Sequence, residues 1–414
     1  MKLNLENFTA PDLDTWRSKI KAEQKSAENL LYLNDIEDIE FDPSQKKMLF
    51  DFDTNDSKST NDWGITAYRI VDNIQESNRF LLQCLKQGAN ELFLDIRMQD
   101  TDWSVLFNNI HLDYIHTSVC IQNAEQLNSL ITYLPEATQK HFSISLDPIH
   151  PIALDTVLDS KFSISISGFG LEQIGGKASD QISLLLCFGA SIIDRLKNPE
   201  RIQFELGIGS DFFVELAKTR ALKWLWKHLL NENNINSSGT KVMARIGWTN
   251  KSLKDPDINI LRQTTESISA VSGGASSILI HDSHIYSEEK NSWFYQRLAL
   301  NISHVLKEEA YLTKVNDPLK GAFVIEMLTE CLVKKSWNSF LKSMDLGMQQ
   351  YIETILKEEV QEIRNKKLKA FDGDKRQLIG INLFPKESDK KNTWKGIPKY
   401  LDFNYLIFEK HQDV

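Results

Sequence analysis

Short apolar runs rich in β-branched residues recur from residue 63 onward and alternate with stretches of helical periodicity. Several runs are apolar at nearly every position, which is typical of strands covered on both faces of a parallel sheet. Others, such as Phe142–Leu146, alternate small polar with apolar residues, which fits strands with one face toward a barrel lumen. The runs are Glu91–Ile96, Tyr114–Ile121, His141–Leu146, Phe162–Ser167, Ile202–Ile208, Val242–Trp248, Ser276–His281 and Leu378–Phe384. Eight strands separated mostly by helices predict an α/β protein with a (β/α)8 TIM barrel, and an open doubly wound sheet is the alternative.

Helical segments separate the predicted strands. Gln75–Gln87 ends at Gly88, a residue type that often terminates helices. Ser210–His228 carries apolar residues on one face, and Asp257–Val271 stops before a pair of glycines. A long block from Tyr295 to Phe371 is nearly all helical in pattern. The sequence therefore predicts a helical insertion before the last strand.

Residues 1–62 differ from the rest of the chain. A short amphipathic helix is expected around Leu13–Leu31, followed by an acidic stretch and a polar break at Asp53–Asp62. Such a segment has little core of its own and needs a surface to pack on, either its own barrel or another subunit. We therefore divide the chain into an N-terminal arm, residues 1–62, and a barrel, residues 63–414.

Composition limits the class of protein. Hydrophobic residues make up 41% and charged residues 25% of the chain, as in globular proteins. The net charge of −9 argues against nucleic acid as a partner. The four cysteines form no CxxC pair and lie in apolar stretches, which indicates buried free thiols in a reducing compartment. No secretory pattern and no apolar run of about 20 residues is found, so we expect a cytoplasmic protein that does not enter a membrane.

Two short motifs suggest cofactor sites, but neither is complete. Gly207-Ile208-Gly209 lies between a predicted strand and a predicted helix, as in a dinucleotide-binding loop, yet the third glycine position is Phe212. Asp282-Ser283-His284 matches the start of a cobalamin-ligating D-x-H-x-x-G motif, yet the glycine position is Ser287. We interpret the second motif as a polar loop at the barrel rim. No metal-ligand spacing is found.

Five segments, in this order and spacing, carry the strongest signal. They are Ile164–Gly176 (ISISGFGLEQIGG), Phe204–Arg220 (FELGIGSDFFVELAKTR), Ala244–Leu253 with Asn259–Ala270 and Ser272–Ala275, Arg297 with Leu306–Leu312 and Val315–Pro318, and Leu378–Pro385. Over roughly residues 63–385 the chain resembles the methylmalonyl-CoA mutase family. A match to one signature would mean little, but five agree.

The resemblance implies a division of labour. In the family, a (β/α)8 barrel threads the coenzyme A arm of the substrate through its middle, and a flavodoxin-like domain holds adenosylcobalamin over the barrel mouth. Cobalt–carbon homolysis makes a radical, and the thioester carbonyl migrates between adjacent carbons. In this chain we expect no cobalamin-binding flavodoxin-like domain.

The family signature after the fourth predicted strand reads I-S-I-S-G-Y-H. Its histidine donates a hydrogen bond to the thioester carbonyl, and its tyrosine lies beside it. Here Phe169 and Gly170 occupy these positions. Loss of one oriented donor costs on the order of 10²–10³ in rate in other enzymes.

Two further family segments are missing. The T-I-Q-N-D-like segment has no counterpart at His141–Ala153, and the proline- and arginine-rich entrance is reduced to Asp62-Trp63-Gly64-Ile65 before the first predicted strand. We therefore predict no catalytic, cofactor-binding or metal-binding residue in this chain.

These departures make the chain similar to the small subunit of heterodimeric members, a non-catalytic structural subunit. The resemblance implies that a large catalytic subunit carries adenosylcobalamin and converts methylmalonyl-CoA and succinyl-CoA, and that the arm wraps this partner. One alternative is an acyl-CoA-binding subunit whose cobalamin is carried on a separate chain. Another is a degenerate barrel that holds acyl-CoA as a sensor or assembly ligand. The structural interpretation predicts a filled lumen, with candidate fillers Phe142, Phe162, Phe169 and Phe204.

Overall fold

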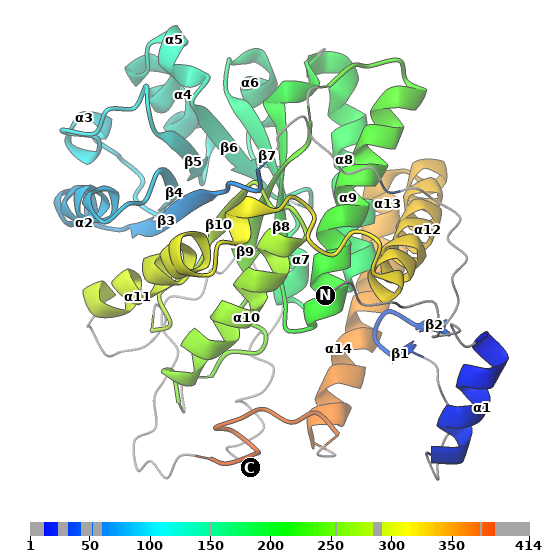
Figure 1. Cartoon of the computed structure of the whole chain (residues 1–414). Coiled ribbons are helices and arrows are strands. Elements are labelled where there is room, and N and C mark those ends of the chain that lie inside the picture. The colour runs from blue at the N-terminus through cyan, green and yellow to red at the C-terminus, as the bar shows by residue number, and fades with distance from the viewer. Residues whose placement is uncertain are drawn as a thin grey trace, which may run out of the picture.

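Eight parallel strands close into a barrel in the order β10-β3-β4-β5-β6-β7-β8-β9, which confirms the predicted (β/α)8 barrel (Figure 1). The structure is a computed structural model that describes residues 12–23, 32–42, 52, 60–149, 151–196, 198–237, 239–252, 255–284, 292–372 and 375–385. The barrel strands are β3 (Gly64–Val71), β4 (Glu91–Ile96), β5 (His116–Cys120), β6 (Phe142–Leu146), β7 (Ser163–Ser167), β8 (Ile202–Ile208), β9 (Lys241–Ile246) and β10 (Ser277–Leu279). The barrel closes where Ser277 of β10 pairs with Gly64 of β3.

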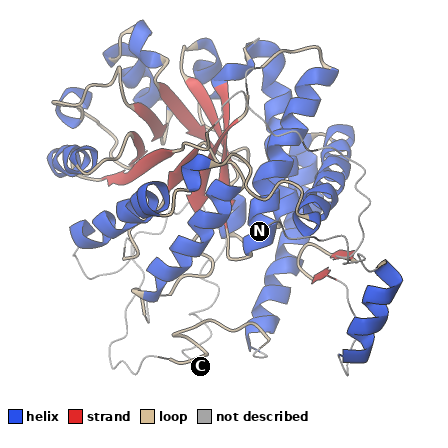
Figure 2. Ribbon diagram, in the orientation of Figure 1, coloured by secondary structure: helices blue, strands red, loops and turns tan. Residues whose placement is uncertain are grey.

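Helices surround the barrel on its outer side (Figure 2). Those between strands are α2 (Ile74–Lys86), α3 (Trp103–Leu106), α4 (Ala124–Tyr133), α5 (Glu136–Gln139), α6 (Leu154–Asp159), α7 (Phe169–Gln173), α8 (Ala178–Leu196), α9 (Phe212–Glu232) and α10 (Ile258–Ser272). After β10 come α11 (Ser292–His304), α12 (Phe323–Leu346), α13 (Met348–Tyr351) and α14 (Lys357–Asp372). Helix α12 packs over α8 and α9 as an additional outer layer. Among the described helices, none has the length and apolar character needed to span a membrane.

One predicted barrel strand is wrong. Leu378–Phe384 forms a turn with an isolated bridge between Ile379 and Leu383 and takes no part in the barrel. Gly380 (φ 80°) and Phe384 (φ 51°) adopt left-handed conformations, which an extended strand does not accommodate.

The strand that the sequence pattern missed is β3. Tyr68 and Arg69 interrupt its apolar run, so it does not resemble the other strands. Tyr68 faces the lumen, whereas Arg69 lies over the ring of Phe80 and donates a hydrogen bond to Ser77 of α2. Because β3 is the first strand and β10 the last, the helical block from α11 to α14 follows the barrel instead of being inserted before its last strand.

Alternation along the strands determines which side chains face the lumen. Ile144 and Ile164 are buried in the core beneath the helices. Ser143, next to Ile144, points inward, because it hydrogen-bonds Ser118 of β5 (2.7 Å) and Gln203 of β8 (2.7 Å) across the barrel. The period of two therefore places the branched residues outward and the serines inward.

Three of the four predicted lumen fillers face outward, so that prediction is wrong for Phe142, Phe162 and Phe204. Phe142 packs edge-on against Phe107, with 5.8 Å between ring centroids. These rings belong to the core beneath the helices, because they share the strand face of the isoleucines. The lumen is instead filled by a cluster of Tyr68, Phe93, Met243 and Leu279.

Part of the N-terminal arm packs on the chain's own barrel. The hairpin of β1 (Tyr32–Asn34) and β2 (Ile39–Phe41) lies beside α12, and α1 (Leu13–Glu23) lies farther out (Figure 1). Glu37, in the hairpin turn, accepts hydrogen bonds from the backbone N–H groups of Ala178 (2.5 Å) and Ser179 (3.3 Å) at the start of α8. These N–H groups have no partner within the helix, so a residue about 140 positions away caps α8. The role of the arm as a wrap around a partner stays a prediction.

Candidate functional site

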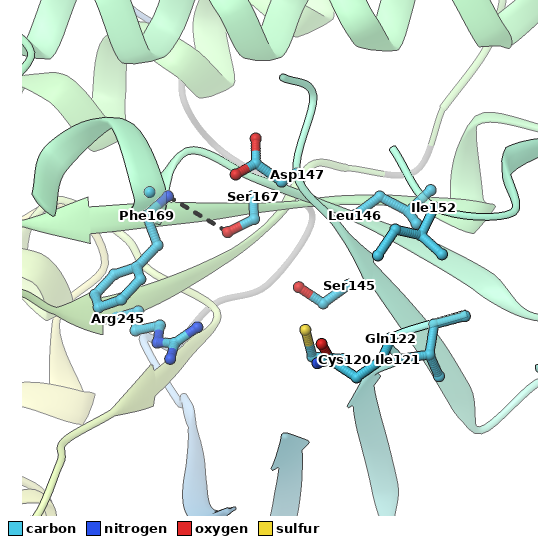
Figure 3. Close-up of a pocket in the computed structure, with 11 residues that line it drawn as sticks. Cys120, Ile121, Gln122, Ser145, Leu146, Asp147, Ile152, Ser167, Phe169 and Arg245 are labelled. Carbon is cyan, nitrogen blue, oxygen red and sulfur yellow. Dashed lines mark hydrogen bonds between the residues drawn. The ribbon is translucent and has the colours of Figure 1, made fainter. Parts of the chain in front are cut away.

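Phe169 and Gly170 lie at the C-terminal end of the barrel, where α7 begins directly after β7. This is the face on which (β/α)8 enzymes build their active sites. The backbone N–H of Gly168 donates to Glu205 of β8 (2.8 Å), and the N–H of Phe169 donates to Ser167 (3.4 Å; Figure 3). These bonds turn α7 across the barrel mouth. Both Phe169 and Gly170 are buried there.

The ring of Phe169 covers the guanidinium of Arg245, which rises from β9. The Arg245 Cζ atom lies 3.8 Å from the Phe169 ring centroid, 4.8 Å from that of Phe93 and 5.2 Å from that of Tyr68. Its Nε donates to Nε2 of His281 (3.3 Å). Burial lowers the pKa of His281, so this imidazole stays neutral and can accept the bond. Arg245 is thus held in an aromatic cage that closes the mouth.

The cavity that remains at the mouth is small. It measures about 100 Å³, and its walls include Cys120, Ser145, Ser167 and Arg245 (Figure 3). Pockets for small-molecule ligands usually measure roughly 300–1,000 Å³. Phe169 and Gly170 offer no side-chain donor to it, and burial raises the pKa of the Cys120 thiol, which disfavours a reactive thiolate.

A network of hydrogen-bonded side chains crosses the lumen below this cavity. Ser118, Ser143 and Gln203 form its centre, and Nε2 of His116 lies 3.3 Å from the Ser143 hydroxyl. Burial lowers the pKa of His116 to about 4, so its ring is neutral. Below this network, at the N-terminal end of the barrel, a second pocket of about 520 Å³ is lined partly by Glu91, His116 and Lys241. His116 and Gln203 of this network also line that pocket, which shares no lining residue with the mouth cavity.

The incomplete cobalamin motif, Asp282-Ser283-His284, is part of the packed structure. Asp282, Ser283 and His284 lie in the loop after β10, as expected for the barrel rim, but all three are buried. The Asp282 carboxylate accepts the backbone N–H of His284 (2.7 Å), and the His284 ring stacks on Tyr295 with 3.6 Å between centroids. The loop is therefore packed into the fold. Among the described residues, no three His, Cys, Asp or Glu side chains converge to hold a metal ion.

Sequence reasoning missed a polar cleft beside the mouth. It measures about 620 Å³ and lies between the β1–β2 hairpin, the start of α8, the β8–α9 loop and the end of α14. Its walls include the buried carboxylates of Glu172 and Glu215. Gly207 and Gly209 also belong to this region, because a Cβ atom at Gly207 would collide with the Glu172 side chain. The signal in the sequence was the glycine loop, whose glycines make room for a carboxylate.

Comparison with known proteins identifies the family. A family model described as methylmalonyl-CoA mutase matches residues 157–400, more than half of the chain, and the match includes β7, α7 and Arg245 of β9. The chain belongs to the methylmalonyl-CoA mutase family.

Curated members of the methylmalonyl-CoA mutase family align along much of the chain. The "Methylmalonyl-CoA mutase small subunit" of Porphyromonas gingivalis is 27% identical over 368 residues, which cover 78% of this chain and 59% of that protein. The "Methylmalonyl-CoA mutase" of Rhizobium meliloti is 29% identical, covering 55% of this chain and 34% of that protein. The "Methylmalonyl-CoA mutase large subunit" of Propionibacterium freudenreichii subsp. shermanii is 28% identical, and the alignment covers 55% of this chain and 33% of that protein. The matched part of the chain spans about a third to three fifths of the length of these relatives.

Proposed function

We propose that this chain is the non-catalytic structural subunit of an adenosylcobalamin-dependent methylmalonyl-CoA mutase. A separate large subunit carries the cofactor and interconverts methylmalonyl-CoA and succinyl-CoA. The names of two relatives, one a small and one a large mutase subunit, support such a pairing. The complex is proposed to work in the cytoplasm, which stays a prediction from the sequence.

The observation that carries this proposal is the closure of the mouth by Phe169 over Arg245. A barrel that rearranges a coenzyme A thioester needs an open path to the mouth and a donor aimed at the migrating carbonyl. The mouth cavity of about 100 Å³ is too small for the pantetheine arm, and Gly170 has no side chain to donate. The Asp282–His284 loop does not fit a cobalamin ligand, because the His284 ring is buried against Tyr295.

The test uses the purified full-length chain and a co-expressed large mutase subunit. The chain alone, with adenosylcobalamin and methylmalonyl-CoA, should form no succinyl-CoA. Light scattering of the chain mixed with the large subunit should detect a heterodimer. This heterodimer should be active in the same assay. Turnover by the chain alone at a rate comparable to a complete mutase, or a monomer that persists beside the large subunit, would overturn the proposal.

A matched variant separates a lost donor from a missing cofactor. Phe169→Tyr with Gly170→His restores the family pair, and this double variant alone should still be inactive because the cofactor is on the partner. Turnover by the double variant with adenosylcobalamin would contradict the placement of cobalamin on the large subunit. Calorimetry with coenzyme A thioesters tests the acyl-CoA-binding alternative, which predicts saturable binding to the isolated chain.

A further inference from the structure

The turn of the β1–β2 hairpin is held on α8 by a buried carboxylate. Glu37, in this turn, is 3% exposed, and its carboxylate accepts the backbone N–H groups of Ala178 and Ser179. The Ser179 hydroxyl donates to the same carboxylate (2.9 Å). Hydrogen bonds from a helix N-terminus are strongest when the acceptor is ionised. The contact between the turn and α8 therefore depends on the balance of charge around it.

A second buried carboxylate lies on the same turn of α8. Asp180 is 1% exposed and accepts the backbone N–H of Lys177 (3.1 Å). Burial, more than any other cause, raises the pKa of Asp180 from 3.8 to about 7. Lys177 opposes this rise, whereas the carboxylates of Glu37 and Glu359 add to it. Asp180 therefore changes its charge near neutral pH, beside the residue that holds the hairpin turn.

Lysine side chains balance these carboxylates only in part. The Lys177 ammonium lies 3.7 Å from Asp180 and 3.3 Å from Glu359 of α14, so these two carboxylates share it. Lys367 of α14 also attracts Glu37. When Asp180 is ionised, three carboxylates stand beside two ammonium groups. The excess of negative charge then destabilises the contact between the turn and α8.

Two phenols complete the titratable surroundings. Tyr351 of α13 interacts with Asp180, and burial raises the pKa of this phenol to about 12. Tyr32 of β1 interacts with Glu37, and burial raises the pKa of this phenol as well. Both phenols are therefore uncharged near neutral pH, where Asp180 titrates.

The hairpin turn is also one wall of the polar cleft, which residues 35–37 line together with residues 209–212 of the β8–α9 loop. The strands of the hairpin are anchored separately, because Ile39 and Phe41 of β2 are buried in the core. The turn can therefore move while the strands stay in place. Its movement away from α8 widens the cleft of about 620 Å³.

The other polar contacts of the turn lie at the surface. The Lys335 ammonium lies 3.2 Å from the Asp38 carboxylate, and the Lys366 ammonium donates to the backbone carbonyl of Asp35 (2.9 Å). Both contacts are exposed, and such surface contacts contribute little to stability. The buried contact of Glu37 with α8 thus dominates the position of the turn.

We propose that the hairpin turn, residues 35–38, is a pH-controlled gate of the polar cleft, which rests on α8 while Asp180 is protonated and moves away when Asp180 ionises. Movement of the turn removes the Glu37 carboxylate and lets water reach the first turn of α8. The pKa of Asp180 is therefore lower in the open state than in the closed state. Because the closed state holds the proton more tightly, closure is strongest below the open-state pKa and weakens as the pH rises through about 7.

Hydrogen–deuterium exchange with mass spectrometry on the full-length chain tests the gate between pH 5.5 and pH 8.5. The amides of Ala178 and Ser179 report directly, because Glu37 accepts them in the closed state. After correction for the intrinsic pH dependence of exchange, opening at these amides and in residues 35–38 should rise roughly 10-fold, since one unit of pKa difference between the two states corresponds to a factor of ten. Peptides of β7 should stay protected throughout, which separates movement of the turn from global unfolding.

Three variants test the role of Asp180. Asp180→Asn removes the titrating group and should keep the turn closed at pH 8.5. Glu359→Gln leaves the Lys177 ammonium to Asp180, so the midpoint of the opening should move to lower pH. Asp194→Asn, at an exposed position of the same helix, is the matched control and should reproduce the pH profile of the unmodified chain.

The unmodified chain by itself decides whether the gate exists, so this test does not depend on the folding of a variant. Exchange at Ala178, Ser179 and residues 35–38 that is equal at pH 5.5 and pH 8.5 overturns the proposal. A pH-dependent opening that Asp180→Asn retains, or one in which β7 opens in step with the turn, overturns it as well. None of these measurements involves a large subunit, so this proposal and the proposed function are tested separately.

Discussion

The guanidinium of Arg245 lies under the ring of Phe169, 3.8 Å from its centroid, and this contact closes the C-terminal mouth of the barrel. Phe169 follows the end of β7, and Arg245 lies near the end of β9. The contact therefore also connects two parts of the barrel rim. A cation held against an aromatic ring in a desolvated place is worth up to about 2 kcal/mol. The closure is thus part of what stabilises the barrel.

Phe169→Ala should lower the free energy of unfolding by about 3–5 kcal/mol, because it leaves a cavity and uncovers Arg245. Phe169→Tyr keeps the ring and should be nearly neutral. Urea unfolding followed by circular dichroism measures both. Phe213→Ala, at a residue 47% exposed on α9, is the control and should change stability by no more than about 0.5 kcal/mol. Equal stability of Phe169→Ala and the control would show that the ring does not close the mouth.

Arg220→Met should destabilise the chain by about 3–5 kcal/mol. Arg220 of α9 is fully buried, and it donates to Asp317 (3.2 Å), to Glu326 (2.9 Å) and to Thr329 (3.1 Å). Its loss leaves two buried carboxylates beneath α12 without this cation. The midpoint of thermal unfolding of Arg220→Met is compared with that of Lys227→Met. Lys227 is exposed on the same helix, so its replacement should have little effect. If Arg220→Met has an equally small effect, Arg220 does not stabilise the fold through its buried ion pairs.

Glu37→Ala should loosen the β1–β2 hairpin from the barrel, because Glu37 supplies the cap of α8. The loss of such a cap costs about 1–2 kcal/mol, which corresponds to roughly 5- to 30-fold faster amide exchange in residues 32–42. Hydrogen–deuterium exchange with mass spectrometry measures this directly. Glu40→Ala, on an exposed position of β2, should leave the exchange unchanged. If both variants exchange alike, Glu37 does not anchor the hairpin.

Asp282→Asn should change how stability depends on pH. Burial raises the pKa of Asp282 to about 7 from 3.8. The folded state therefore holds this proton more tightly than the unfolded state, and stability from this group falls as the pH rises from about 4 to about 7. When the pH rises from 5 to 8, the free energy of unfolding of the variant should fall by roughly 2–3 kcal/mol less than that of the unmodified chain. Denaturant titrations at the two pH values measure the difference. Asp345→Asn, exposed on α12, should follow the unmodified chain, and identical profiles for both variants would contradict the burial argument.

The sequence predicted the barrel because local patterns encode it. Seven of the eight apolar runs became strands, and Ile202–Ile208 did so with the same bounds. The prediction failed where a strand carries large polar residues. Tyr68 and Arg69 concealed β3, since Tyr68 faces the lumen and Arg69 packs on α2. The apolar Leu378–Phe384 was taken for a strand although backbone conformation at Gly380 and Phe384 prevents it.

The sequence also located the candidate site but not its geometry. Phe169 and Gly170 could be assigned from the ISISG segment, because the segment is contiguous in the chain. The contact of Phe169 with Arg245, and the cleft floored by Glu172 and Glu215, join residues from separate βα units. No local pattern relates them.

What the sequence by itself determined is the family, the (β/α)8 barrel and the replacement at Phe169 and Gly170, because each is written in contiguous residues or in a regular period. What only the tertiary structure decided is which strand closes the barrel, which rings fill the lumen, and which buried carboxylates come together. These depend on closure of the sheet and on burial, which are set by distances across the fold. Phe142 and Phe169 looked alike in the sequence, but one faces the helices and the other closes the mouth.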